Sequence, residues 1–395
     1  MPDASGSPDM PTPGARVLIL GVSTRAIAQS AVRAGFRVIC VDAFGDLDLP
    51  AGARSIALPR DLGVPYGAKA AMHASRDIDC DAVAYVADLE NHPAIVCALA
   101  TGRALWGNPP EVLVRVRDPL LLTRALDRRG LPTAAVRARG TQPSATHWLV
   151  KPRHSGGGRG IRAWRSGAPV GRDEYLQERV DGAPASVVFA ADGVRAVPLG
   201  LSRQIVGGRA FGAAGFRYCG SILTGGDAAL DDALCDAGGA LARAVTEEFG
   251  LVGVNGIDFV VRDGVPIPVE VNPRWSASME LVERAYDINV FAVHARACAG
   301  ALPAFDLARA RRRAPAALGK AIVYARRAER PTDTERWLAD PDVRDVPRPG
   351  ERVPRGGPVC TTFASGADLE SCHAALECRA ADIYRALAAA PANAP

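Results

Sequence analysis

The chain has 395 residues, 48% of them hydrophobic, and a formal net charge of +4. This length excludes a single small module and predicts two to four domains, at roughly 100 to 200 residues each. Because acidic and basic residues nearly balance, the composition excludes a disordered acidic chain and a strongly basic nucleic-acid-binding protein. Three of the 47 basic residues are lysines, Lys69, Lys151 and Lys320, which makes each lysine conspicuous.

The N-terminal segment and the cysteines indicate where the protein works. No apolar run reaches the roughly 20 residues that cross a bilayer. Residues 1–14 lack the basic and apolar regions of a secretion signal, and we predict a disordered tail there. The nine cysteines have no paired spacing, which indicates free thiols in a reducing compartment. We therefore expect a cytoplasmic protein that binds neither membranes nor nucleic acid.

The first folded segment, residues 15–112, begins with the strand–helix–strand pattern of a parallel α/β domain. Its first turn contains Gly21 but lacks the second glycine that lets a pyrophosphate approach the backbone, which argues against NAD. A later strand, AVAYVAD, leads to Glu90. Ligands bind beyond the carboxyl ends of such strands, so Glu90 is placed to face a cleft. Alternatively, it is an acid that favours the start of the next helix.

A glycine-rich loop follows a strand predicted at residues 147–151. The strand delivers Lys151, and the backbone N–H groups of Gly156, Gly157, Gly158 and Gly160 can approach an anion without a Cβ in the way. The lysine precedes the glycines and no Gly-Lys-Ser/Thr follows, so the segment is not a Walker loop. The pattern indicates a loop that covers phosphates, and the alternative is an ordinary surface turn.

Two weaker signals flank this loop. Asp118 is predicted to cap a helix that ends at Gly130. The short strand in YLQERVDG can offer one backbone carbonyl and one amide to the edge of a purine, with Gln177, Glu178 and Val180 as candidates. Taken alone, that segment is an edge strand and a turn.

The hairpin GIDFVVRDGVPIPVEVN gives the sharpest signal. Glu270 and Asn272 are two positions apart, so their side chains share a face, and the hairpin can bring Asp258 beside them. Two carboxylates and an amide oxygen suit Mg²⁺ held jointly with phosphate oxygens. Arg274 follows the strand, where its guanidinium can grip a phosphoryl or carboxylate group. The alternative is a hairpin with exposed acids.

The last region begins with a predicted linker. Its three consecutive arginines start at Arg311, and we interpret them as a solvated run rather than a phosphate site. Two strands, AIVYA and VCTTFA, and a closing helix follow.

In combination, these motifs resemble the ATP-grasp superfamily, and most closely its carboxylate–amine ligases related to biotin carboxylase. The resemblance covers nearly the whole chain and implies a mixed fold class, α/β and α+β. It implies a Rossmann-like pre-ATP-grasp domain at residues 15–112 and a two-subdomain ATP-grasp fold at residues 113–300. A glycine-loop lid is expected at about residues 145–176, and a small C-terminal domain at residues 301–395.

The resemblance also implies roles for individual residues, with Lys151 and Arg274 as the catalytic pair. ATP and Mg²⁺ are the implied cofactors, with Mn²⁺ as an alternative metal. The implied ATP contacts are Lys151, Gly156, Gly157, Gly158, Gly160, Gln177, Glu178 and Val180. The implied metal ligands are Asp258, Glu270 and Asn272. Predicted substrate contacts are Glu90, Arg217 and Ser276.

Two positions depart from the family pattern. Relatives carry a further ATP-contacting lysine where this chain has Asp118 and Pro119. They also place a ribose-binding acid where this chain has Pro184, for which Glu178 is a candidate replacement. The candidates to replace the missing lysine are Arg115, Arg117 and Arg124.

The predicted reaction joins a small-molecule carboxylate to an amine. The carboxylate attacks the γ-phosphorus of ATP to give an acyl phosphate, and the amine captures it as an amide with release of ADP and phosphate. Relatives linked to pterin one-carbon carriers suggest that an amino acid such as glutamate is added to a cofactor precursor. The alternatives are a carboxylase that activates bicarbonate, for which no Met-Lys-Met carrier segment is present, and a non-catalytic nucleotide-binding regulator. Lys69 and Lys320 have no convergent partners in the sequence, whereas Lys151 does.

Overall fold

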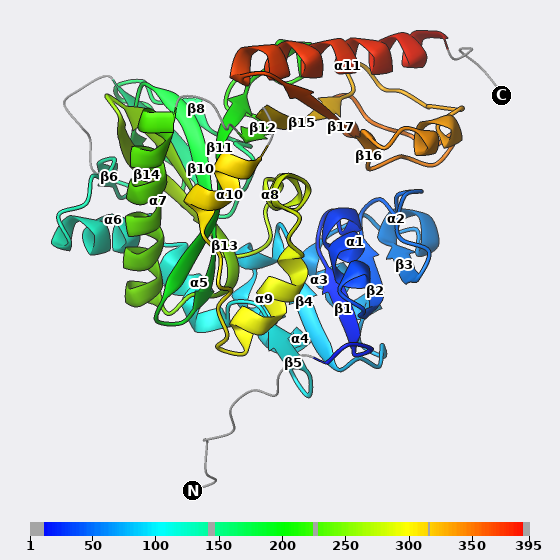
Figure 1. The fold of residues 1–395 in the computed structure, drawn as a ribbon, viewed down its shortest axis with the longest axis horizontal. Coiled ribbons are helices and arrows are strands. Elements are labelled where there is room, and N and C mark those ends of the chain that lie inside the picture. The colour runs from blue at the N-terminus through cyan, green and yellow to red at the C-terminus, as the bar shows by residue number, and fades with distance from the viewer. Residues whose placement is uncertain (1–11, 141–146, 224–227, 315–316, 390–395) are drawn as a thin grey trace, which may run out of the picture.

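The structure is a computed structural model that describes residues 12–140, 147–223, 228–314 and 317–389 (Figure 1). Most of the predicted tail, residues 1–11, and residues 145 and 146 of the predicted lid lie outside the described residues. The described residues form three β-sheets. No helix among them is long and apolar enough to span a membrane.

The N-terminal part is a five-stranded parallel sheet with the order β3-β2-β1-β4-β5. Its strands are β1 (Arg16–Leu20), β2 (Arg37–Asp42), β3 (Ala53–Ala57), β4 (Ala82–Tyr85) and β5 (Ala104–Trp106). The helical segments are α1 (Arg25–Arg33), α2 (Leu58–Asp61), α3 (Ala68–Ala74), η1 (Leu89–Asn91) and α4 (Pro93–Leu99). Successive strands are added on one side of β1 up to β3 and then on its other side from β4 onward. A ligand-binding edge is therefore expected beyond the carboxyl ends of β1 and β4.

A small antiparallel sheet follows, with the order β6-β9-β7-β8. Its strands are β6 (Val136–Arg137), β7 (Trp148–Pro152), β8 (Arg162–Ala163) and β9 (Glu174–Glu178), and the preceding helices are α5 (Pro110–Val116) and α6 (Pro119–Arg128). The predicted helix cap is confirmed, because Oδ1 of Asp118 accepts from the amides of Leu120 and Leu121 at 2.8 and 3.1 Å.

The largest sheet has eight antiparallel strands in the order β14-β13-β10-β11-β12-β15-β17-β16. The strands are β10 (Ala183–Asp192), β11 (Ala196–Val206), β12 (Tyr218–Leu223), β13 (Val252–Arg262), β14 (Val265–Asn272), β15 (Ala317–Tyr324), β16 (Val343–Arg344) and β17 (Pro358–Gly366). The helical segments are η2 (Arg209–Phe211), α7 (Ala228–Phe249), α8 (Met279–Tyr286), α9 (Val290–Cys298), α10 (Leu307–Arg313), η3 (Glu335–Ala339) and α11 (Leu369–Ala389).

Strand β10 explains why this sheet is covered on both faces. Its central residues, SVVFAA, are apolar or small and buried. Val187 and Phe189 lie in the core that α7 completes, whereas Val188 and Ala190 lie in the core shared with α8 and α9. Successive side chains of a strand point to opposite faces, so an uninterrupted apolar run is the pattern of a strand buried on both sides.

The C-terminal strands continue the large sheet. Strand β15 pairs with β12 from Gly220 opposite Ala321 to Leu223 opposite Leu318. In Figure 1, α11 lies along the outer face of β15 and β17, and its buried side chains share a core with these strands. The large sheet therefore contains strands from both sides of the predicted domain boundary at residue 300, and the division into domains stays a prediction.

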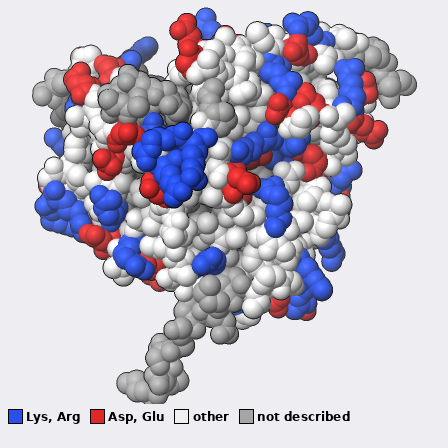
Figure 2. Space-filling view, viewed as in Figure 1, with Lys and Arg blue, Asp and Glu red and all other residues white. Residues whose placement is uncertain are grey.

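Two predictions about local structure are wrong. The arginine triplet is not in a linker but ends helix α10, where Arg311 is buried while Arg312 and Arg313 are exposed. Figure 2 shows basic side chains gathered over this part of the molecule. Strand β9 is not an edge strand, because it pairs with β6 on one side and β7 on the other.

Candidate functional site

The hairpin of β13 and β14 has the geometry that the sequence predicted. Asp258 lies directly opposite Glu270, and Asn272 follows two positions along β14. Asn272 donates from Nδ2 to Oδ2 of Asp258 over 2.9 Å. Gln204 on β11 donates from Nε2 to Oδ1 of the same carboxylate, also over 2.9 Å. The hairpin thus places two carboxylates and an amide next to one another.

The two carboxylates have opposite electrostatic environments. Burial and the charge of Glu270 raise the pKa of Asp258, against hydrogen bonds from Ser186 and Asn272. Burial also acts to raise the pKa of Glu270, but the charges of Arg117 and Lys151 outweigh it and lower that pKa. Glu270 is therefore the more readily ionised member of the pair. A further cation would help to ionise Asp258.

This set of oxygen atoms fits a magnesium ion. Among the described residues, no group of three or more His, Cys, Asp or Glu side chains is placed to hold a metal. The set here differs because its third oxygen belongs to the amide of Asn272. A hard divalent cation relieves the repulsion between Asp258 and Glu270, and Mg²⁺ commonly takes one or two carboxylates and completes its shell with water and phosphate oxygens.

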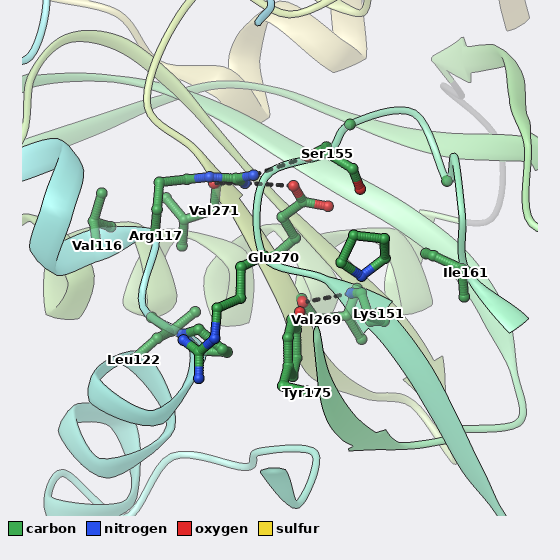
Figure 3. A pocket seen from close by; sticks show the side chains of 15 residues that line it. Val116, Arg117, Leu122, Lys151, Ser155, Ile161, Tyr175, Val269, Glu270 and Val271 are labelled. Carbon is green, nitrogen blue, oxygen red and sulfur yellow. Dashed lines mark hydrogen bonds and ion pairs between the residues drawn. The ribbon is translucent and has the colours of Figure 1, made fainter. Parts of the chain in front are cut away.

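Lys151 points into the same cleft from the end of β7. Its buried Nζ donates to Oε1 of Gln177 over 3.0 Å and to the carbonyl of Val269 over 3.2 Å. Figure 3 shows Lys151 and Glu270 among the side chains that line one cavity. Tyr175 on β9 adds an aromatic wall, with Nζ of Lys151 6.0 Å from its ring centre. The structure therefore brings the lysine, the hinge glutamine and the metal hairpin together.

The glycine loop closes over this cavity. The amide of Tyr218 donates to the carbonyl of Gly157 over 3.1 Å. A Cβ on Gly158 would lie 1.8 Å from the carbonyl oxygen of Phe216, so this close approach requires glycine. The cavity beneath has a volume of about 30 Å³, far below the roughly 300 to 1,000 Å³ of small-molecule sites. In this conformation the cavity is too small for a nucleotide.

The predicted adenine hinge is partly used by the protein itself. The amide of Glu178 donates to the carbonyl of Ala135 over 2.8 Å, and its Oε2 accepts from the amide of Ala135 over 3.0 Å. Gln177 is buried against Lys151, and Val180 follows the last paired residue of β9. An adenine contact through the Glu178 amide would have to break its hydrogen bond to Ala135, and the hinge stays a prediction.

Arg274 links the metal hairpin to the N-terminal sheet. Its Nη2 donates to Oδ1 of Asn272 over 3.0 Å, and its Nε donates to Oε1 of Glu90 over 2.9 Å. Glu90 lies in η1, beyond the carboxyl end of β4, and its buried Oε2 has no hydrogen-bond partner among the described residues. Glu90 is therefore buried at this edge of the sheet in an ion pair with Arg274, and its contact with a substrate stays a prediction.

The other two predicted substrate residues have different surroundings. The hydroxyl of Ser276 is 3.2 Å from that of Ser278, just after Arg274 in the chain. Arg217 stacks on Tyr324 of β15, with its guanidinium carbon 3.6 Å from the ring centre. Its packing partner is in the C-terminal region, so the structure does not bring Arg217 together with the Glu90–Arg274 pair.

Three residues of this region carried no decisive sequence signal. Arg117 was one of three candidates for the missing lysine, and it forms an ion pair with Glu270. By contrast, Arg115 donates to the carbonyl of Glu248, outside the cavity. Gln204 and Ser186 reach Asp258 from other strands, and only the pairing of β10, β11 and β13 could reveal them.

A protein-family comparison decides the identity of this region. Residues 116–278, which contain the glycine loop, the hinge and the metal hairpin, match the family model of the ATP-grasp domain. This part of the chain is an ATP-grasp domain. The predicted superfamily and the predicted fold class are thereby confirmed. No curated protein matches the chain in sequence.

Solved structures with the same fold extend the likeness beyond the ATP-grasp domain. Rhizobium etli pyruvate carboxylase matches 95% of this chain with a TM-score of 0.70 and 14% identity, and this chain spans 37% of its length. A biotin carboxylase–beta-gamma-ATP complex from Campylobacter jejuni matches 91% of this chain and 89% of its own, with a TM-score of 0.67 and 14% identity. An L-amino acid ligase from Bacillus licheniformis matches 94% and 98%, with a TM-score of 0.66 and 14% identity.

Proposed function

We propose that the protein is an ATP-dependent carboxylate–amine ligase that works through an acyl phosphate. The observation that carries the proposal is the chain of contacts from Asp258 through Asn272 and Arg274 to Glu90. It connects the oxygen cluster of the ATP-grasp domain to the edge of the parallel sheet where ligands bind. A phosphate donor on one side and an acceptor on the other would then meet at Arg274.

The residues of the cleft have distinct tasks in this mechanism. Lys151 and the glycine loop bind the nucleotide phosphates, and closure of the loop keeps water from the reactive acyl phosphate. Arg274 holds the phosphoryl group between ATP and the substrate carboxylate. Asp258, Glu270 and Asn272 would hold Mg²⁺, which neutralises developing charge on the phosphates.

Glu90 is proposed to bind the amine that captures the acyl phosphate. Its buried Oε2 has no partner among the described residues, whereas Oε1 is held by Arg274. A carboxylate oxygen in this position can orient an ammonium group and accept its proton before attack. The balanced reaction gives an amide, ADP and phosphate.

The substrates that we propose are more specific than the geometry of the site alone indicates. Following the resemblance to ligases linked to pterin one-carbon carriers, we propose an amino acid such as glutamate as the amine and a precursor of such a carrier as the carboxylate. The likeness to the Bacillus licheniformis L-amino acid ligase supports an amino-acid substrate. The reducing environment expected for nine free cysteines supports a cytoplasmic location.

A screen of carboxylate and amine pairs by ADP release, with mass spectrometry of the product, tests this function. Turnover that requires both partners and yields their amide would support it. Glu270→Gln should lower that turnover about 100-fold, as expected when a group that neutralises transition-state charge is lost. Turnover of this variant near the wild-type rate would contradict the metal assignment.

One alternative is favoured by a specific likeness. Pyruvate carboxylase and biotin carboxylase share this fold over more than nine-tenths of the chain. If the protein instead activates bicarbonate, ADP will form with bicarbonate in the absence of any amine. Nucleotide binding without ADP production across the whole screen would identify a non-catalytic regulator.

A further inference from the structure

The cation nearest to the candidate metal ligands is Arg117, and the proposed mechanism gives it no task. Its side chain is 12% exposed and forms an ion pair with Glu270. Its Nη2 donates to Oδ1 of Asn91 over 3.0 Å and to the carbonyl of Ser155, in the glycine-loop segment, over 2.9 Å. Its buried Nε has no hydrogen-bond partner among the described residues.

We propose that Arg117 is a latch that exchanges partners when the nucleotide binds. Without nucleotide, its guanidinium neutralises Glu270 in place of the metal and holds the glycine loop through Ser155. When Mg²⁺ and the nucleotide enter, Glu270 turns to the metal and Arg117 turns to the phosphates. The inference rests on the proposed nucleotide site, but not on which carboxylate or amine the enzyme joins.

The position of Arg117 fits this exchange. It follows α5 directly and precedes Asp118, the cap of α6, so its backbone is fixed between two helices. Figure 3 shows its guanidinium beside the carboxylate of Glu270 at the cavity that Lys151 also lines. A planar fork with five N–H donors can release one carboxylate and grip phosphate oxygens without moving its backbone.

Charge balance supplies the driving force. In the nucleotide-free protein, the ion pair with Arg117 offsets the charge of Glu270. A metal ion bound to Glu270 would leave the mostly buried guanidinium with no anion but Glu90, which already pairs with Arg274, and this is unfavourable. The polyphosphate supplies the missing negative charge. Metal and nucleotide should therefore bind together better than either binds alone.

A latch and a structural ion pair make opposite predictions for metal binding. If Arg117 competes with the metal, Arg117→Met should raise the affinity of the nucleotide-free protein for Mg²⁺ while it lowers the affinity for MgADP. We expect about a tenfold change in each direction, the effect of roughly 1.4 kcal/mol per contact. If Arg117 only stabilises the fold, both affinities should fall together.

Isothermal titration calorimetry with Mg²⁺ alone and then with MgADP measures both quantities without any acceptor substrate. Arg117→Lys keeps the positive charge but loses the planar guanidinium with its paired N–H donors. The affinity for Mg²⁺ should therefore stay near wild type, and the affinity for MgADP should fall by less than in Arg117→Met. Tryptic cleavage after the exposed Arg159 in the loop should be faster in Arg117→Met, because the contact to Ser155 is lost.

The matched control is Arg115→Met. Arg115 is exposed on the same helix and donates to the carbonyl of Glu248, so neither affinity should change. Circular dichroism and the melting temperature establish that each variant is folded. An Arg117→Met protein that is folded but shows unchanged or weaker Mg²⁺ binding would overturn the latch, whatever the ligase screen finds.

Discussion

Two clusters of buried charged side chains in this protein differ in how fully their polar atoms are paired. We call Arg25, Asp48, Glu280, Lys320 and Asp345 the interdomain cluster, and Glu90, Arg117, Lys151, Asp258, Glu270 and Arg274 the cleft cluster. In the interdomain cluster, Glu280 pairs with both Arg25 and Lys320, the latter over 2.6 Å. Among the described residues, none of its five side chains has a buried polar atom without a partner, although Oδ2 of the neighbouring buried Asp46 has none. The cleft cluster has two such atoms, on Glu90 and Arg117.

The pKa shifts show the same contrast. Burial acts to raise the pKa of Glu280, but Arg25 and Lys320 outweigh it and drive the pKa well below its usual range. Burial and a neighbouring acid raise the pKa of Asp258. Each acid of the interdomain cluster pairs with Arg25 or Lys320, although burial and Asp345 still raise the pKa of Asp48. In the cleft, Asp258 lies opposite Glu270, and atoms of Glu90 and Arg117 have no partner among the described residues. We therefore interpret the cleft as the place where a ligand belongs.

The largest effect should come from breaking the interdomain cluster. Glu280→Gln leaves Lys320 buried without its paired anion and removes one of the three acids that face Arg25, and we expect a loss of about 3 to 5 kcal/mol of unfolding free energy. Asp258→Asn removes a repelling charge, so stability should be unchanged or higher while amine-dependent ADP release falls. Denaturant unfolding of both variants, with activity measured in parallel, compares the clusters directly. The comparison fails if Asp258→Asn is the less stable protein.

The lysines divide in the same way. Lys320→Met removes a hydrogen-bonded charge from Glu280 and should cost about 1.5 to 3 kcal/mol of stability. Lys151→Met should leave the melting temperature near wild type and raise the KM for ATP about tenfold or more, because a phosphate contact is lost. Calorimetry and ATP-dependent kinetics separate the two outcomes. An unchanged ATP dependence would remove Lys151 from the nucleotide site.

The two acids should respond to pH with opposite signs. Glu280 has a folded-state pKa below its ordinary 4.5, so its contribution to stability is complete above pH 4.5 and is lost as pH falls through the folded pKa. Asp258 has a folded-state pKa above its ordinary 3.8. The stability that its protonation contributes is therefore complete below pH 3.8 and is lost as pH rises through the folded-state pKa. Urea unfolding across this range should show the first dependence vanish in Glu280→Gln and the second in Asp258→Asn. Unaltered profiles in both variants would refute the assignment.

The smallest effect is expected at the third lysine. Lys69 is exposed on α3 and lies in neither cluster. Lys69→Ala should change the unfolding free energy by less than about 0.5 kcal/mol and leave the KM for ATP unchanged. A measurable change in either quantity would show that lysines outside the two clusters also matter.

The sequence predicted those parts of the site that are set by local geometry. The spacing of Glu270 and Asn272 and the hairpin turn place both beside Asp258, and the glycines mark the loop over the cavity. The interpretation of Lys320 as a residue without convergent partners is wrong, because it is buried against Glu280. Arg25, the other partner of Glu280, lies 255 residues before it in the sequence, and such a contact depends on how the sheets assemble.

The same limit applies to Arg117. Three arginines near the missing lysine looked equivalent in the sequence, and helix phase alone does not say which one reaches Glu270. Their environments separate them, because α5 and α7 are packed together at Arg115, whereas Arg117 follows the end of α5 at the cavity. Gln204 was missed for the same reason, since its contact to Asp258 passes over β10, the strand between β11 and β13 in the large sheet.

The pairing of β12 with β15 limits how the chain can be divided. A chain cut at the predicted boundary would turn β12 into an edge strand with unpaired amide and carbonyl groups. Another copy could supply the missing strand, so a truncated protein would tend to associate by strand exchange. The C-terminal region is therefore unsuited to being exchanged as a cassette between related ligases, because any replacement must restore the register from Gly220 to Leu223.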